Sequence, residues 1–219
     1  MVAAFEVEGY RPRDEGYFVS YSAPGRQVGR LALDNDRTLF LLVFAANQAP
    51  RIDAHDTNAQ KRVLIAEYSE AGWECPQILA ELENTSEFYF DRVSQIRMNS
   101  WSRGRVALLG DAAFCPSLLA GQGSALAMTA AYVLAGELGR KDGAPEEAFQ
   151  RYEELLKPFM AGKQKAAEQF ATSFAPRTRW GIYLRNQVMN AFRLPYVAKL
   201  VLGRTLLDDL QLPIYQVRH

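Results

Sequence analysis

A carboxylate and two glycines stand at the ends of one loop. Asp111 comes shortly after the apolar stretch 105–109, which predicts a β-strand. Gly121 and Gly123 flank the start of the Ala-rich stretch 122–138, which predicts a helix. This order brings the carboxylate and a helix N-terminus to one crevice, and ligands of open α/β sheets bind in such crevices.

These residue types suit a flat ligand that carries hydroxyl groups and an oxygen that becomes anionic. The free N–H groups of a helix N-terminus carry about half an elementary positive charge. Asp111 can accept hydrogen bonds from a sugar or sugar alcohol, and glycines let a bulky ligand approach the backbone. An ordinary strand-to-helix turn would use the same residues, with Asp111 bonded to local N–H groups. The residues alone leave both interpretations open.

A long motif adds to these observations. The segment RVALLGDAAFCPSLLAGQGSALAMTAAYVLAGEL resembles the third flavin fingerprint of the FAD-dependent aromatic hydroxylases. These are the class A flavoprotein monooxygenases, similar to p-hydroxybenzoate hydroxylase and the tetracycline-inactivating monooxygenases. The resemblance extends weakly to the preceding sheet segment and to the tail that ends in LPIY, so it covers most of the chain.

The resemblance implies roles for particular residues. Asp111 matches the aspartate that binds the flavin ribityl chain, and Pro116 matches the proline near the isoalloxazine. The backbone that faces flavin N1 and the C2 carbonyl matches Gly121, Gln122, Gly123, Ser124 and Ala125. A helix N-terminus at that place would stabilise the anionic reduced flavin. Arg105 matches a basic position of the motif, and it fits a solvent-facing residue at a strand start equally well.

The chain departs from the family pattern in three ways. Phe114 replaces a histidine and Leu118 replaces a proline that many relatives have; neither change removes a predicted flavin contact. The GxGxxG turn that holds the FAD pyrophosphate is absent, because Gly25 and Gly29 do not lie between a strand and a helix. The chain therefore resembles only the C-terminal half of such an enzyme. An N-terminal half chain or a homodimer would cover the apolar strand 105–109.

The function that the resemblance implies is hydroxylation of a small aromatic or polyketide-like molecule with FAD, NADH or NADPH, and oxygen. One alternative is a non-catalytic interaction or ligand-binding module descended from such an enzyme. Another is reduction or halogenation on the same architecture. The candidates for lining the substrate cavity are Tyr17, Tyr21, Phe40, Phe44, Tyr89 and Phe90. Aromatic residues are common strand formers, so packing in the sheet core is the preferred interpretation for them.

The predicted fold class is α+β. Residues 1–99 are expected to form part of a substrate-binding antiparallel sheet domain, with strands at 17–23, 27–34 and 38–46 and β-character at 87–98. Helices are expected at 56–72 and 76–83. Residues 100–143 are expected to be the last strand, loop and helix of an FAD-binding α/β domain. Residues 144–219 are expected to be helical, with a helix from 145 bent at Pro158 and others at 177–192 and 196–207.

Composition excludes several other classes. The chain has 219 residues, 48% of them hydrophobic, and no net charge. Two cysteines and two histidines are too few for a disulfide framework or a usual zinc site, and Cys115 is expected to be a small buried apolar residue. No run approaches the roughly 20 apolar residues that span a membrane. The basic residues of the tail are not clustered, so no nucleic acid is expected. The expected location is the cytoplasm.

Overall fold

The computed structural model describes residues 1–46, 52–140, 144–191 and 210–215. The chain divides into two compact units. Unit 1 is Met1–Arg92 with Thr172–Phe192, and unit 2 is Val93–Ala171 with Arg193–His219. The sequence-based division at residues 99 and 143 differs from this one, because most of the long helix that begins at Pro145 groups with the segment that precedes it.

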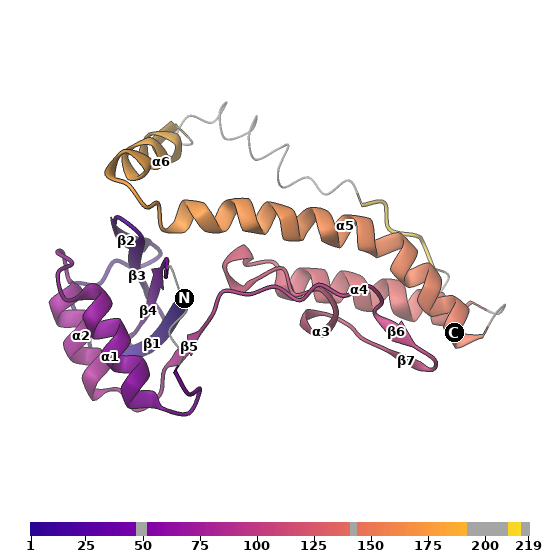
Figure 1. Cartoon of the computed structure of the whole chain (residues 1–219), viewed down its shortest axis with the longest axis horizontal. Helices are drawn as coiled ribbons and strands as arrows, with labels where there is room; N and C mark the ends of the chain where they lie inside the picture. Colours follow the sequence, from indigo (N-terminus) through magenta and orange to yellow (C-terminus); the bar gives the residue numbers. More distant parts are fainter. Residues whose placement is uncertain (47–51, 141–143, 192–209, 216–219) are drawn as a thin grey trace. The chain divides into compact units, whose positions relative to one another are not determined.

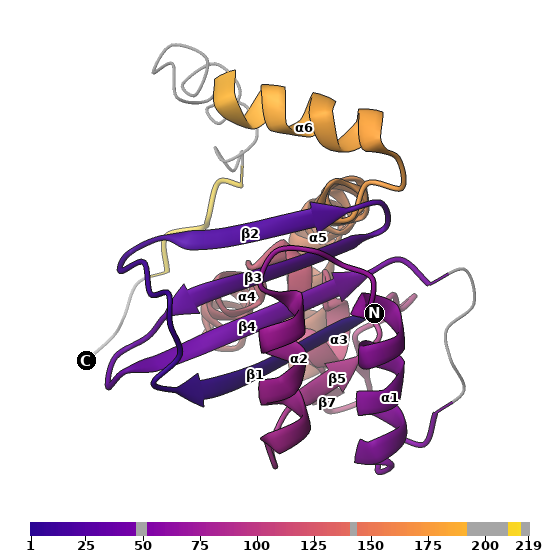
Figure 2. The same ribbon diagram turned by 90° about the vertical axis from the view of Figure 1, so that its left-hand side faces the viewer.

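Unit 1 is built on one antiparallel sheet, whose strands contain both buried and partly exposed side chains. Its strands are β1 (Val2–Glu8), β2 (Phe18–Ala23), β3 (Arg26–Ala32), β4 (Arg37–Phe44) and β5 (Tyr89–Asp91). Their order is β2-β3-β4-β1-β5, and every neighbouring pair is antiparallel (Figure 2). The three predicted strands at 17–23, 27–34 and 38–46 are confirmed as β2, β3 and β4. β1 was not predicted, although Phe5, Glu6, Val7 and Glu8 alternate as strand residues do.

Two helices cover one face of this sheet (Figure 2). They are α1 (Thr57–Tyr68) and α2 (Cys75–Asn84). Side chains of alternate strand positions pack against them, and the buried cluster includes Phe5, Phe40 and Leu42 with Leu64 and Ile78. The predicted start of α1 is confirmed, since the Asp56 carboxylate accepts a hydrogen bond from the Ala59 N–H at 2.8 Å.

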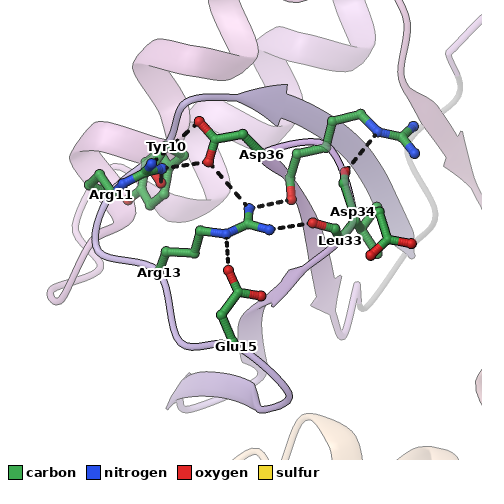
Figure 3. Close-up of polar contacts among 8 residues, drawn as sticks. Tyr10, Arg11, Arg13, Glu15, Leu33, Asp34 and Asp36 are labelled. Carbon is green, nitrogen blue, oxygen red and sulfur yellow. Dashed lines mark hydrogen bonds and ion pairs between the residues drawn. The ribbon is translucent and has the colours of Figure 1, made fainter.

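The turn between β3 and β4 is held by arginine side chains (Figure 3). Asn35 and Asp36 have φ angles of 58° and 56°, as the central residues of a type I′ hairpin do. Arg13 donates to the carbonyl of Arg37 at 2.7 Å and to that of Leu33. Arg11 donates to both oxygens of the Asp36 carboxylate, at 2.9 and 3.3 Å. The turn residues of the sequence therefore fold as predicted, and charged side chains fix them.

Unit 2 begins with an irregular segment, which is followed by helices. Its elements are β6 (Ser102–Arg103), β7 (Val106–Ala107), α3 (Asp111–Phe114), the 3-10 helix Leu118–Ala120, α4 (Gly123–Leu138) and most of α5 (Pro145–Phe174). The predicted strand 105–109 is wrong in extent, because only Val106 and Ala107 are paired, and they pair with β6. Outside that pairing, the Leu108 N–H donates to the Trp101 carbonyl at 2.7 Å, and other backbone groups of this segment bond to side chains of α5.

α5 packs along α4 through the apolar face that the sequence predicts. Phe149, Tyr152, Leu156 and Met160 are buried on it, and Phe159 is half-buried. Pro158 lies inside α5, which bends part-way along its length (Figure 1). A further helix, α6 (Arg179–Ala191), belongs to unit 1 and agrees with the prediction for 177–192. The helix predicted at 196–207 lies outside the described residues.

The described end of the chain docks on α4. The ring of Tyr215 lies against Gly136, where an added Cβ would come within 2.2 Å of it. The Tyr215 hydroxyl donates to the buried Glu137 carboxylate at 2.8 Å, and Arg151 donates to the same carboxylate at 2.7 Å. Gly136 thus has a packing role, since any side chain there would displace the tyrosine.

Candidate functional site

Asp111 and the start of α4 lie side by side. A Cβ built on Gly123 would lie 3.5 Å from Oδ1 of Asp111, so the carboxylate faces the first turn of the helix. The side chain of Asp111 is exposed, and it begins the short helix α3. Two residues that are 12 positions apart in the sequence are therefore brought together, as the crevice interpretation requires.

Gly110 allows the chain to approach α4 so closely. Its φ angle is +62°, a conformation that other residues rarely adopt. An added Cβ would also lie 3.2 Å from the Cβ of Ala127 on α4. The φ angle of Gly110 and its contact with Ala127 both require glycine directly before Asp111. They therefore fix the position of the Asp111 backbone, from which the carboxylate projects.

The first turn of α4 is open to a ligand. Gln122 is the N-cap residue, and no side chain caps the helix. Ser124 and Ala125 are exposed, and Gly121 has a φ angle of +64° at the end of the 3-10 helix. N–H groups at a helix start have no partner inside the helix, so they remain available to an electron-rich ligand atom.

The loop between α3 and the 3-10 helix is buried at its centre. Pro116 and Ser117 are buried, and Ser117 has a φ angle of +117° although it is not glycine. Cys115 is half-buried; burial raises the pKa of its thiol, and the nearby carboxylate of Asp111 raises it further. This thiol is therefore kept neutral, in accord with the predicted packing role.

The structure sorts the aromatic candidates by sheet face. Phe40 and Phe44 are buried against the helices, and Tyr21 and Phe90 pack on the same cluster. Tyr17 is 72% exposed and precedes β2. The preferred core interpretation is therefore confirmed for Phe40, Phe44 and Phe90.

The other sheet face presents a different set of side chains. Ala4, Gly29 and Leu41 lie in one lane across the strands, and Tyr89 ends that lane. The ring of Phe18 covers Gly29, because a Cβ there would come within 2.2 Å of it. Sequence analysis missed Phe18, although its place in the alternation of β2 put it opposite Tyr21.

Other predicted and missed residues of unit 2 can now be placed. Arg105 is exposed beside the β6–β7 turn, in accord with the solvent-facing interpretation. Gln95 and Gln164 were not predicted, yet their amides bond to the loop that contains Pro116. The sequence had no signal for them, since neither lies in the motif and glutamine is common on helix surfaces.

The donor set fits the ribityl and isoalloxazine parts of a flavin. Asp111 is an acceptor suited to ribityl hydroxyls, and the first turn of α4 supplies N–H donors next to it. The glycine at position 123 leaves the space that a flat ring needs. These are the parts of the cofactor that the sequence resemblance assigns to this segment.

Comparison with known proteins decides the family. The family model described as "FAD binding domain" matches residues 2–166, which is most of the chain. The chain belongs to this family. The match includes the sheet of unit 1 as well as Asp111 and the start of α4, so both regions come from one family pattern.

Two relatives with an assigned function are flavin enzymes. A "Flavin-dependent monooxygenase" from an unknown prokaryotic organism is 48% identical over 122 residues, which are 56% of this chain and 31% of the relative. Another with the same name, also of unknown prokaryotic origin, is 37% identical over 187 residues, covering 78% of this chain and 48% of the relative. The chain thus spans about half or less of the curated relatives it matches.

Solved structures give the same picture. The crystal structure of tetracycline destructase Tet(51) has a TM-score of 0.76 and 30% identity, covering 98% of this chain and 54% of the other. Klebsiella pneumoniae HpxO, complexed with FAD and uric acid, has a TM-score of 0.65 at 21% identity, covering 84% of this chain and 48% of the other, and shows a shared fold. Within the described residues, no helix is long and apolar enough to cross a membrane.

Proposed function

We propose that the chain provides the ribityl- and isoalloxazine-binding part of an FAD-dependent monooxygenase that hydroxylates an aromatic or polyketide-like molecule. The observation that carries the proposal is the Asp111 carboxylate beside Gly123 at the start of α4. Asp111 binds ribityl hydroxyls, and the N–H groups of Gly123, Ser124 and Ala125 face the ring atoms that become electron-rich on reduction.

The bound flavin would supply the redox chemistry, with NADH or NADPH as reductant and oxygen as oxidant. The chain's own residues position the cofactor and exclude water. Pro116 is buried next to the loop backbone and limits the movement of the ring on that side.

The proposed substrate class is supported by the sheet face that lies opposite α1 and α2. Phe18 and Tyr89 are 48% and 46% exposed there, with Leu41 and small residues between them. A flat, apolar ring system fits such a surface, as aromatic contacts favour stacked or edge-on rings. The likeness to a tetracycline destructase supports a polycyclic, polyketide-like substrate.

A flavin titration tests the cofactor part. The purified chain is titrated with FAD and followed by flavin absorbance and fluorescence, beside Asp111→Ala and the matched control Glu154→Ala, which removes an exposed carboxylate of α5 in the same unit. Hydrogen bonds to a charged group contribute roughly 1.5–3 kcal/mol. Asp111→Ala should therefore weaken FAD binding by about 10- to 100-fold, while the control binds as the parent does.

Other outcomes decide against the proposal. Equal FAD affinity for the parent and Asp111→Ala would remove the assigned role of Asp111. A chain that ignores FAD under all conditions would favour the alternative function, a non-catalytic module.

The substrate part needs its own test. Tetracycline is used as a fluorescent polycyclic probe, with Phe18→Ala as the variant. Tyr17→Ala is the control, since it removes a neighbouring aromatic ring that precedes the strand. Weaker binding only in Phe18→Ala supports the assigned face, and equal weakening in both would contradict it.

We also infer that a further polypeptide surface covers β7 in the working enzyme, either an N-terminal half chain or a second copy. Val106 is 66% exposed and Leu109 is 38% exposed, which supports such a cover. Sedimentation of the chain over a concentration series tests the second copy. A monomer at all concentrations would leave the half chain as the only form of this inference.

A further inference from the structure

Three consecutive carbonyls of the loop 114–117 point at side-chain amides. The carbonyls of Phe114, Cys115 and Pro116 each accept a hydrogen bond from a glutamine. The Cys115 carbonyl also accepts a hydrogen bond from the backbone N–H of Ile96 at 3.1 Å. The loop therefore takes its form from side chains rather than from a regular backbone ladder.

Gln164 is the first of these glutamines. It projects from α5 and is only 7% exposed. Its Nε2 lies 3.2 Å from the Phe114 carbonyl oxygen, 3.3 Å from that of Cys115 and 2.6 Å from that of Ile96. One buried amide thus ties the loop to both α5 and the segment that runs beside it.

Gln95 is the second, and its amide can point in one direction only. Its Nε2 donates to the Pro116 carbonyl at 2.7 Å and to the backbone carbonyl of Gln164 at 2.8 Å. Its Oε1 accepts from the Arg97 guanidinium at 3.0 and 3.1 Å, and Arg97 pairs with Glu168 at 2.7 Å. Because the guanidinium has no acceptor, the amide cannot turn over without losing these bonds.

The residue that follows needs such support. Ser117 is 6% exposed, has a φ angle of +117° and has no hydrogen-bond partner for its hydroxyl. A conformation of this kind persists only where the surroundings fix it. The chain then forms the 3-10 helix and Gly121, which lead into α4. The backbone in front of the helix therefore depends on the carbonyls that the glutamines hold.

We propose that Gln95 and Gln164 are positioning residues for the loop 114–121, which they hold in the form that presents Pro116 and the α4 N-terminus to the flavin. The part about the flavin rests on the function proposed above. Neutral amides suit this role, because they supply donors to three carbonyls without placing a charge next to the ring.

Hydrogen exchange of the chain without cofactor tests the positioning. The variants are Gln164→Met and Gln95→Met, which keep length but remove the donors. Gln150→Met is the matched control, since Gln150 is an exposed residue of α5. The amides of Ala120 and Gly121 bond within the 3-10 turn. Their exchange rates should be at least about 10-fold higher in each variant than in the parent, and the control should have the parent's rates.

A charge variant separates donor loss from a simple packing defect. Near neutral pH, Gln164→Glu places a carboxylate against the carbonyls of Phe114, Cys115 and Ile96. Hydrogen exchange of the loop should therefore be faster than in the parent. In acid the protonated carboxyl regains one O–H donor, and the ratio to the parent should fall. A packing defect would give the same ratio at both pH values, and that result would overturn the proposal.

FAD titration of the same variants tests the link to the cofactor. Each Met variant should bind FAD at least about 10-fold more weakly than the parent, and the double variant should lose less than the product of the two, because both side chains hold the same loop. Unchanged loop exchange would overturn the proposal even if FAD binds. A parent that ignores FAD overturns the proposed function, while the exchange data still decide the positioning.

Discussion

The two units satisfy their backbone polar groups in different ways. In unit 1, β1, β3 and β4 pair along seven registered positions, so the ladder serves most of the backbone. In unit 2, β6 and β7 pair over two residues each. Elsewhere in the segment before α3, several backbone groups bond to side chains of α5. The α5 side chains that bond to it are Tyr152, Glu153, Lys157 and Gln164.

This difference separates stability from function. A sheet with a helical cover is stabilised by many similar contacts, so no single hydrogen bond of the ladder decides its form. A loop that is held by a few side chains can take an irregular form, which a ligand site requires, but each contact then carries more of the structure. The loop 114–121, for which we propose a flavin contact, belongs to the second kind.

The largest effect is expected in the core of unit 1. Phe40 is fully buried and contacts the rings of Phe5 and Tyr10. Phe40→Ala should lower the free energy of unfolding of unit 1 by about 3–5 kcal/mol. Urea unfolding followed by hydrogen exchange checks this for each unit. Equal loss of protection throughout unit 2 would show that the two units unfold together.

The next effect is expected where α5 holds the irregular segment. The Glu153 carboxylate accepts from the Trp101 N–H and the Ser100 hydroxyl, both at 3.0 Å, and pairs with Lys157. Glu153→Leu leaves these donors unsatisfied, at roughly 1–3 kcal/mol for each buried group. Unit 2 should lose about 2–4 kcal/mol by urea unfolding. The control Glu154→Leu, at the exposed neighbouring position, should change little.

A smaller effect is expected in the β3–β4 turn. Asn35 has a φ angle of 58°, which a β-branched residue adopts only with strain. Asn35→Val should destabilise unit 1 by about 1–2 kcal/mol. Asn35→Gly should cost less, as glycine adopts this conformation freely. Thermal unfolding compares the two, and equal costs would indicate that side-chain bonds rather than backbone strain matter there.

The smallest effect concerns pH. Burial by itself would raise the pKa of Glu153, but hydrogen bonds from Lys157, Ser102 and Ser100 outweigh it and lower the pKa. A lowered pKa in the folded state means that its stabilisation is present above pH 4.5, the ordinary value, and is lost as pH falls towards the folded value. The free energy of unfolding should fall by about 1 kcal/mol or less, since the Glu153–Lys157 ion pair is partly exposed.

Urea midpoints between pH 3 and pH 6 check this, with Glu153→Gln as the comparison. The variant should lose less stability in acid than the parent does. A parallel decline in both proteins would assign the acid sensitivity to other carboxylates, such as Glu137, whose pKa is also lowered despite burial, by hydrogen bonds from Arg151 and Tyr215.

Sequence reasoning succeeded where local patterns decide structure. The three strands between residues 17 and 46, the start of α1 and the helix that begins at residue 145 all follow from residues within a few positions of one another. It failed for the extent of the strand 105–109, whose apolar residues lack long partners in the described chain. It also missed β1 and Phe18, although the local alternation of strand residues marked both.

The sequence by itself determined the chemistry of the site. Asp111, Gly121 and Gly123 lie in one motif, and the resemblance of that motif to a flavin fingerprint suggested the cofactor before any contact was known. Only the tertiary structure placed Asp111 against Gly123 and brought Gln95 and Gln164 to the carbonyls of the loop. The reason is physical: residue types fix which bonds a side chain can make, but partners distant in sequence meet only after the helices and strands have packed.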